Sequence, residues 1–287
     1  MSAPDLTKLR ERLRPDAELD ERVRAHLREQ LGGVLPADPE RGLGWYYDWV
    51  VLGSRSFEAF EILSRHDRRP ELPWLDLGSG LGTFVLLAQM RGRATLGIEP
   101  GTAEVQLARE RAAALEGADP SAFTQGVGEA LPYPDASMGG ALLHDVLEHV
   151  GDWRVVLREA YRVLAAGAPL YVKGPSYAVR FVEPHYRVPW LPLLPRPIAR
   201  RYLAALGRDV GYFEHLGYRR RGEVLVELGS LGFELEFPRL AKLRDPTAVN
   251  RPWARRLVEL AGRVPATERL AEGPLQSTID VIARKPG

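Results

Sequence analysis

The order of hydrophobic and polar positions predicts alternating short strands and helices in the middle of the chain. Residues 74–77 are largely apolar and predict a buried strand, and a glycine-rich turn follows at 78–82. Residues 84–88 are apolar almost all round, which predicts a buried helix, and 94–98 predict a second strand that ends just before Glu99. Strand, glycine turn, helix, strand and acid form the first unit of a nucleotide-binding α/β sheet.

Further elements of the same kind follow along the chain. We therefore expect an α/β fold, Rossmann-like and doubly wound, around a mostly parallel sheet. Helical patterns cover 57–65, 102–115, 153–164, 221–231 and 253–262, and strand patterns cover 123–126, 169–173, 233–237 and 277–283.

Residues 16–31 form an amphipathic pattern ahead of this unit. Leu19, Val23, Leu27 and Leu31 recur every four residues, and charges fill the other faces. The favoured interpretation is a helix docked on the domain, and a dimerisation or lid helix is the alternative.

Four aromatic residues then occupy five positions, at Trp45, Tyr46, Tyr47 and Trp49. One use of such a cluster is core packing against the edge of the sheet. The other is a lid whose rings close over a cofactor and an acceptor, where an aromatic face also attracts a sulfonium cation. Residues 1–70 are accordingly assigned to an N-terminal helical and aromatic lid.

The composition limits the class of protein and the kinds of site that are possible, but it does not indicate a function. The 287 residues are 45% hydrophobic and 27% charged, as expected for one large globular domain or one domain with a cap. The net charge of +1 gives no case for nucleic-acid binding. The lack of cysteine excludes disulfides, thiolate metal sites and a cysteine nucleophile, and the charged N-terminal stretch does not resemble a signal peptide. We expect a cytoplasmic protein, either a monomer or a homodimer.

The glycine turn indicates which ligand the sheet binds. Its glycines let the backbone approach a ligand closely, and the next helix presents free N–H groups and a positive dipole end. Glu99 lies 21 residues after Gly78, a spacing at which an acid accepts hydrogen bonds from a ribose. The third glycine, Gly82, comes one residue earlier than in the dinucleotide pattern, where Thr83 would be the glycine, so a dehydrogenase is the weaker alternative.

The segment from Asp76 to Gly82, D-x-G-x-G-x-G, resembles motif I of class I S-adenosylmethionine-dependent methyltransferases. A second stretch, E-A-L-P-Y-P-D at 129–135 with L-E-H-V at 147–150, is similar to the broad small-molecule family that includes ubiquinone- and sugar-modifying enzymes. The resemblance covers about 72–175, with a weaker match at 221–237. It implies a seven-stranded sheet in the order 3-2-1-4-5-7-6 with the seventh strand antiparallel. It also implies S-adenosylmethionine as the cofactor and S-adenosylhomocysteine as its product.

Carried over position by position, the resemblance implies a cofactor site at the carboxyl ends of the strands. The family often has an acid that binds the adenine amino group where this chain has Val127. We therefore expect apolar and backbone contacts to hold the adenine here. The residues implied in cofactor binding are Asp76, Gly78, Ser79, Gly80, Gly82, Glu99, Pro100, Val127, Gly128, Glu129, Leu143 and His144.

A cluster of ionisable side chains follows the fourth strand. His144, Asp145, Glu148 and His149 lie at the edge where ligands of such sheets bind, and His149 matches the histidine of the family. His149 is either a structural histidine or a general base, and both roles stay open. The candidate catalytic residues are His149 first, then His144 or His185. No metal is expected, because methyl transfer needs none and the spacing matches no standard site.

Residues 177–221 interrupt the core after the fifth strand, where the family places an acceptor-binding cap. Prolines oppose regular structure up to Ile198, and a short helix to Leu206 is predicted after them. The segment holds nine arginines against three acids, so it is either a plain basic surface or a site for an anionic acceptor. The cofactor-binding core is then 71–176 with 222–287. The residues predicted to bind the acceptor are Tyr46, Tyr47, His185, Tyr186, Arg200 and Arg201.

The chain is therefore predicted to methylate a small-molecule acceptor, by O-methylation of a sugar-like or anionic natural product. A lipid or quinone acceptor at a membrane surface is the alternative, because Trp190, Leu191, Leu193 and Leu194 lie beside arginines. A cofactor-binding scaffold without transferase activity, and a relative that uses S-adenosylmethionine in another reaction, stay open as well.

Overall fold

The computed structural model describes residues 3–34, 39–238 and 276–287, and the strands within these ranges form one seven-stranded sheet. The order β3-β2-β1-β4-β5-β7-β6 confirms the predicted one. Strands β1 to β5 run parallel, and β7 runs antiparallel to β5 and β6. The strands are β1 (Trp74–Leu77), β2 (Thr95–Glu99), β3 (Phe123–Gln125), β4 (Gly140–His144), β5 (Pro169–Pro175), β6 (Glu234–Glu236) and β7 (Thr278–Arg284).

The central strands are buried on both faces, which is what continuous apolar sequence predicts for a parallel sheet. All four residues of β1 are buried, and so are the first four of β4. The register sets Leu77 of β1 beside Ile98 of β2. Because parallel strands end at the same edge, Asp76, Glu99 and His144 are brought to the side of the sheet where ligands bind in this fold class.

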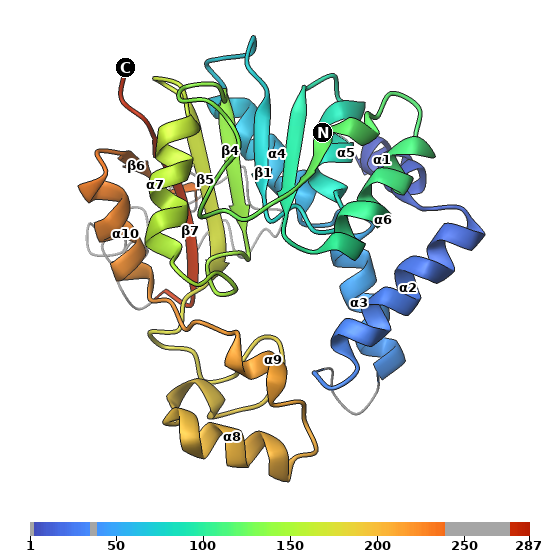
Figure 1. Ribbon diagram of the computed structural model, residues 1–287, viewed down its shortest axis with the longest axis vertical. Coiled ribbons are helices and arrows are strands. Elements are labelled where there is room, and N and C mark those ends of the chain that lie inside the picture. Colours follow the sequence, from blue (N-terminus) through green and yellow to red (C-terminus); the bar gives the residue numbers. More distant parts are fainter. Residues whose placement is uncertain (1–2, 35–38, 239–275) are drawn as a thin grey trace, which may run out of the picture.

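Helices cover both faces of the sheet (Figure 1). One face carries α7 and α10, and the other carries α4, α5 and α6 with α1 beside them. This layering confirms the doubly wound α/β fold. Helix α1, which the sequence pattern did not predict, belongs to the core through Leu9 and Leu13. The elements are α1 (Ala3–Leu13), α4 (Ser56–His66), α5 (Thr83–Met90), α6 (Thr102–Ala113), α7 (Trp153–Val163), α10 (Arg221–Ser230) and the 3₁₀ turn η1 (Pro120–Ala122).

Two further helices, α2 (Ala17–Leu31) and α3 (Pro39–Val50), form an N-terminal lobe beside α6. Helix α2 buries the four apolar residues of its predicted face, so both the helix and its orientation are as expected. Its polar side is tied to α6 by Arg22 with Glu110, 2.6 Å apart, and by His26, which lies 3.1 Å from a glutamate of α6. The lobe is thus docked on the domain.

The insertion after β5 folds into a separate cap, at the lower end of the molecule in Figure 1. It is built on the 3₁₀ turn η2 (Leu191–Leu193), α8 (Arg196–Ala205) and α9 (Gly211–Glu214), around an apolar core to which Val34, after α2, also contributes. Helix α8 begins before the predicted limit at Ile198. The reason is that Pro197 lies in its first turn, where a missing N–H costs no hydrogen bond.

The other predicted elements agree with the structure to within a few residues. Strand β2 includes Glu99 as its last residue, and β3 ends at Gln125. The helix predicted over 253–262 lies outside the described residues. Among the described helices, none has both the length and the apolar composition needed to cross a membrane.

Gly82 sets the distance between α5 and the sheet. Its φ is +78°, and a Cβ added there would lie 2.6 Å from the ring of Phe123. Gly92 has a similar φ of +76° but no atom within 4 Å of an added Cβ. We expect Gly82→Ala to destabilise the fold by about 1–3 kcal/mol more than Gly92→Ala, because only the first adds overpacking to backbone strain. Urea unfolding measures the difference, and equal losses would contradict the packing role.

Candidate functional site

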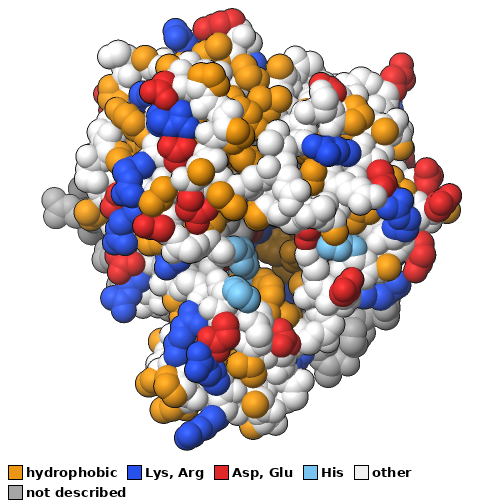
Figure 2. Space-filling model, viewed as in Figure 1, with side chains coloured by type: hydrophobic (Ala, Val, Ile, Leu, Met, Phe, Trp, Pro, Cys, Tyr) orange, Lys and Arg blue, Asp and Glu red, His pale blue; other side chains and the backbone are white. Residues whose placement is uncertain are grey.

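A cavity of about 680 Å³ opens at the carboxyl ends of the parallel strands. It is lined by the glycine turn, by the ends of β1, β2, β4 and β5, and by residues of α3 and the cap. Figure 2 shows the hollow near the centre of one face, with histidine side chains at its rim. The position is that of ligand sites in open α/β sheets.

Glu99 is fixed at one end of the cavity by backbone N–H groups. Gly80 donates to its Oε2 over 3.0 Å, and Gly101 donates to its Oε1 over 3.1 Å. Burial raises the pKa of Glu99, and these two hydrogen bonds act in the opposite direction. The carboxylate is thereby held beside the glycine turn and keeps lone pairs for the hydroxyl groups of a ligand.

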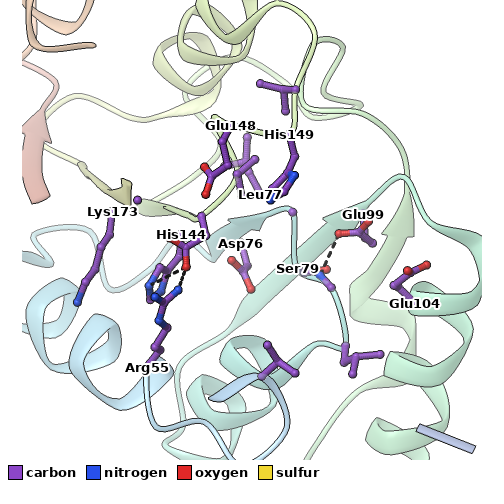
Figure 3. Close-up of a pocket in the computed structure, with 18 of the residues that line it drawn as sticks. Arg55, Asp76, Leu77, Ser79, Glu99, Glu104, His144, Glu148, His149 and Lys173 are labelled. Atoms are coloured by element: carbon purple, nitrogen blue, oxygen red, sulfur yellow. Dashed lines mark hydrogen bonds and ion pairs between the residues drawn. The ribbon is translucent and has the colours of Figure 1, made fainter. Parts of the chain in front are cut away.

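Asp76 projects into the middle of the cavity from β1 (Figure 3). It is 5% exposed, and no described residue donates a hydrogen bond to its carboxylate. Burial, followed by the charge of Glu99, raises the pKa of Asp76 well above its usual range. A buried carboxylate without a partner is costly, so this position suits a cationic or hydrogen-bond-donating group of a ligand.

The glycine turn leaves room for a ligand at Gly80. Its φ is +49°, and no atom lies within 4 Å of an added Cβ. Gly80 lines the cavity, so a side chain there would take up space on the ligand side of the turn. The backbone at this point is therefore open to close approach.

Arg55, from the segment before α4, brings a cation into the cavity. It forms an ion pair with Asp145 and lies over the ring of Trp49. Burial lowers the pKa of Arg55 to about 9, which leaves the guanidinium charged at neutral pH. Asp145 is held at a φ of +55°, a strained conformation that persists only where surrounding contacts enforce it.

His144, the last residue of β4, is a neutral imidazole in this setting. Burial, followed by the charges of Arg55 and Lys173, lowers its pKa well below the usual value. Its Nε2 is buried without a hydrogen bond and lies 3.8 Å from a carboxylate oxygen of Asp145. Lys173 is itself paired with Glu58. His144 therefore adds a polar group to the cavity without adding a charge.

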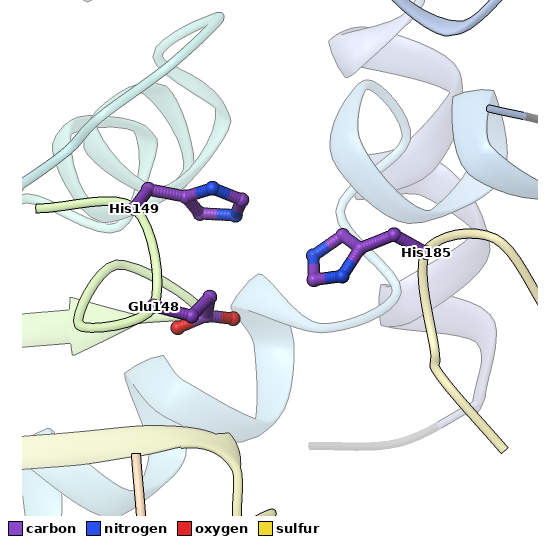
Figure 4. A group of neighbouring side chains, drawn as sticks. All are labelled: Glu148, His149 and His185. Carbon is purple, nitrogen blue, oxygen red and sulfur yellow. The ribbon is translucent and has the colours of Figure 1, made fainter. Parts of the chain in front are cut away.

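Glu148, His149 and His185 meet at the other end of the cavity (Figure 4). One nitrogen or oxygen atom of each lies within 4.8 Å of the others. Burial raises the pKa of Glu148 to about 7 and, with a smaller effect of His185, lowers that of His149 to about 3. An imidazole with so low a pKa accepts a proton poorly at neutral pH. His185 comes from the cap, and its Nδ1 lies 2.7 Å from Oε1 of Glu183.

Aromatic rings from the N-terminal lobe and the cap surround this end of the cavity. Trp45, Tyr46 and Trp49 of α3 line it, together with Tyr212 of the cap. The rings of Trp45 and Trp49 are 4.4 Å apart, and the guanidinium of Arg187 lies 4.5 Å from the ring of Trp45. This cation–π contact joins the cap to α3 beside the cavity.

The cavity brings together most residues predicted from the sequence. All three candidate catalytic histidines line it. Gly82 and Leu143 do not, because Gly82 faces Phe123 and the pleat of β4 turns Leu143 away from the side of His144, into the core under α7. The predicted cofactor residues that line the cavity are Asp76, Gly78, Ser79, Gly80, Glu99, Pro100, Val127, Gly128, Glu129 and His144.

Of the predicted acceptor residues, Tyr46 and His185 line the cavity. Tyr47 does not, because one helical step of about 100° turns it toward α2, where its hydroxyl donates to Asp20. Tyr186 is buried in the core of the cap, and its hydroxyl donates to a backbone carbonyl there. These two tyrosines hold elements together rather than face a ligand.

Arg200 and Arg201 lie on α8, outside the cavity lining. Arg200 pairs with Glu214, its Nε 2.5 Å from a carboxylate oxygen, and Arg201 is exposed. Among the described residues, four cations line the cavity: Arg55, Lys173, Arg180 and Arg187. The sequence indicated the three arginines only weakly, since the first follows the aromatic cluster and the other two were counted only in the charge of the cap.

Comparison with known proteins identifies relatives for the central part of the chain. Residues 75–172 match the model of the methyltransferase domain family. The demethylmenaquinone methyltransferase of Tropheryma whipplei (strain Twist) is 34% identical over 162 residues, 56% of this chain and 63% of that protein. The norajmaline N-methyltransferase of Rauvolfia serpentina is 34% identical over 130 residues, 44% of this chain and 44% of that protein. The chain thus spans less than two thirds of the length of either relative.

Among solved structures, the YcgJ protein of Bacillus subtilis matches with a TM-score of 0.50 and 16% sequence identity. The match covers 80% of this chain and 99% of that protein. At this level of identity the likeness shows the fold alone. It extends the agreement in fold beyond the segment that the family model covers.

Proposed function

We propose that this chain is a class I S-adenosylmethionine-dependent methyltransferase that transfers a methyl group to a small-molecule acceptor, because residues 75–172 match the methyltransferase domain family and the strands follow the order that this class implies. The observation that supports this most is the pair of carboxylates beside the glycine turn. Glu99 is held by two backbone N–H groups, and Asp76 is buried without a described partner.

The residues present fit this cofactor. Glu99 would accept hydrogen bonds from the ribose hydroxyls, and Asp76 would pair with the amino group of the methionine portion. Val127 lines the cavity and is 45% exposed, so it offers an apolar surface to the adenine. When bound, S-adenosylmethionine supplies a methyl group on an electrophilic sulfonium. The chain's own residues would align the acceptor with that group and exclude water.

For the acceptor, we propose a ring-bearing molecule with an oxygen nucleophile and an anionic or hydroxyl-rich group, such as a sugar-like or anionic natural product. The rings of Trp45, Trp49 and Tyr212 offer surfaces for the body of such a molecule. Arg180 and Arg187 line the same region and suit planar anions. The two relatives are named for demethylmenaquinone and norajmaline, two different acceptors.

A lipid or quinone acceptor at a membrane surface is the second candidate, favoured by the outer surface of the cap. Phe181, Trp190, Leu193 and Ile198 are 43% to 56% exposed, and the first two rings are 4.3 Å apart. Apolar side chains beside arginines, which Figure 2 shows on the cap, are typical of interfacial binding. Salt-sensitive sedimentation with phosphatidylglycerol vesicles would favour this candidate, and no sedimentation would favour the first.

Isothermal titration calorimetry tests the cofactor assignment. Glu99→Ala should weaken S-adenosylmethionine binding by about 1–3 kcal/mol, or roughly 5- to 150-fold, because hydrogen bonds to a charged group are lost. Glu116→Ala, at an exposed position after α6, is the matched control and should bind as the wild type does. Unchanged affinity in Glu99→Ala would contradict the ribose assignment. Binding of NAD in place of S-adenosylmethionine would replace the proposal with a dehydrogenase.

A further inference from the structure

The cavity holds a group of side chains of the types that bind metals, which the alignment of cofactor and acceptor does not require. Glu148 and His149 come from the loop between β4 and α7, and His185 comes from the cap (Figure 4). One candidate ligand atom of each lies within 4.8 Å of the others. Bonds of about 2.0–2.2 Å to a common ion place ligand atoms roughly 3–3.5 Å apart, so side-chain shifts of about 1 Å complete the site.

Glu148 is a buried acid with an oxygen that no described group satisfies. It is 2% exposed, and its Oε1 makes no hydrogen bond. Arg55 attracts this carboxylate electrostatically but is already paired with Asp145. Because a buried carboxylate oxygen is costly unless it meets a cation or a donor, the position favours a bound cation.

The loop that carries two of the three side chains is held in place. The N–H of Gly217 donates to the carbonyl of Glu148 over 2.7 Å. Arg219 donates to the carbonyls of Leu147 and Val150, each over 2.9 Å. These bonds tie the loop to the segment that leaves the cap, so the two parts that carry the side chains are fixed relative to one another.

His185 has the surroundings of a metal-binding imidazole. Its Nδ1 lies 2.7 Å from Oε1 of Glu183, which is fully buried. Glu183 is fixed in turn by hydrogen bonds from the N–H of Tyr186 and the hydroxyl of Tyr177. With its proton on Nδ1, the ring keeps the lone pair of Nε2 for a ligand. A carboxylate behind a ligating histidine orients the ring and strengthens it as a donor.

We propose that Glu148, His149 and His185 bind a divalent transition-metal ion of the Zn²⁺ class, with Glu183 as the residue that orients His185. Two imidazoles and one carboxylate suit Zn²⁺ better than they suit Mg²⁺ or Ca²⁺, which prefer oxygen ligands. Three protein ligands leave a coordination position for water or a ligand oxygen in the cavity. Spacing along the chain predicted no metal, because His185 lies 36 residues beyond His149 and reaches it only through the fold of the cap.

Titration with Co²⁺, monitored by visible absorption, tests this site. The full-length, untagged protein is treated with chelator and titrated without cofactor or acceptor, so the result does not depend on the proposed transferase function. We expect one equivalent of Co²⁺ to bind and to be displaced by Zn²⁺. Glu148→Gln and His185→Gln should each weaken binding by at least about 100-fold, and Glu183→Gln by about 10- to 100-fold, the range for residues that support a metal ligand.

The control is His215→Gln, an exposed histidine of the same cap, which should bind Co²⁺ as the wild type does. Thermal melts by circular dichroism establish that each variant is folded. If Glu148→Gln does not fold, His149→Gln takes its place. Equal Co²⁺ affinity in folded His185→Gln and wild type would overturn the proposal, and so would a lack of saturable binding by the wild type.

Discussion

Asp76→Asn should raise the melting temperature of the ligand-free protein and, in the same variant, weaken S-adenosylmethionine binding by more than about 100-fold. Asp76 is 5% exposed, and no described group donates to its carboxylate. In the free protein its charge opposes folding, because nothing compensates the lost hydration. Asparagine keeps the shape and removes the charge. The melting temperature should rise by about 2–4 °C for each kcal/mol gained.

The dependence of stability on pH follows from the same carboxylate. Burial raises the pKa of Asp76 well above its ordinary value of 3.8, so between the two pKa values the folded protein binds more protons than the unfolded chain. The free energy of unfolding of the ligand-free protein should therefore fall as the pH rises through this window, and the fall should be smaller in Asp76→Asn. A cationic ligand favours the ionised form, so its affinity should rise with pH over the same window.

Thermal denaturation at several pH values, with calorimetry in two buffers of different ionisation enthalpy, measures both effects. Asp280→Asn is the matched control, because Asp280 is also buried but accepts a hydrogen bond of 3.0 Å from the hydroxyl of Tyr171. It should give no gain in stability. A lower melting temperature for Asp76→Asn would mean that the carboxylate is satisfied in the free protein. Wild-type affinity would remove Asp76 from the cofactor site.

The sheet and the position of the glycine turn and Glu99 at one end of the cavity could be predicted because their signals are local in sequence. Residues 74–77 and 84–88 are buried in the structure, so their apolar composition identified them without knowledge of their neighbours. The glycine turn and Glu99 belong to one strand–helix–strand unit, whose geometry is set within a short stretch of chain. The resemblance to a known family added the order of the strands, which hydrophobic patterns alone do not give.

The other end of the cavity, where we propose that the acceptor binds, could not be predicted to the same degree, because it depends on contacts between distant segments. The ion pair of Arg55 with Asp145 joins residues 90 positions apart, and neither sequence context indicates the other. Tyr46 and Tyr47 are adjacent, yet only Tyr46 lines the cavity. The arginine count of the cap did not show that Arg200 is paired on the surface. Charge totals do not determine where a charge points.

Arg111→Met should destabilise the fold by about 3–5 kcal/mol, an effect that nothing in the sequence pattern indicated. Arg111 lies on α6 and is 3% exposed. Burial lowers its pKa to about 10, so it stays charged at neutral pH. It donates to four oxygens of three different segments, at 2.5 to 3.2 Å, and the variant loses all four of these buried hydrogen bonds. These are the carbonyls of Leu13, Val51 and Leu81 and the hydroxyl of Thr83.

The same hydrogen bonds connect the N-terminal helices to the glycine turn, since Leu13 ends α1, Val51 follows α3, and Leu81 lies within the turn. We therefore expect Arg111→Met to weaken S-adenosylmethionine binding as well.

Arg111→Lys keeps the charge but lacks the planar fork of donors, so it should recover only part of the stability. Arg158→Met, at an exposed position of α7, is the control and should change neither property. Urea unfolding and calorimetry of the folded variants measure the two effects. Lost stability with unchanged affinity would show that the turn keeps its shape without Arg111, whose role would then be limited to anchoring the N-terminal helices.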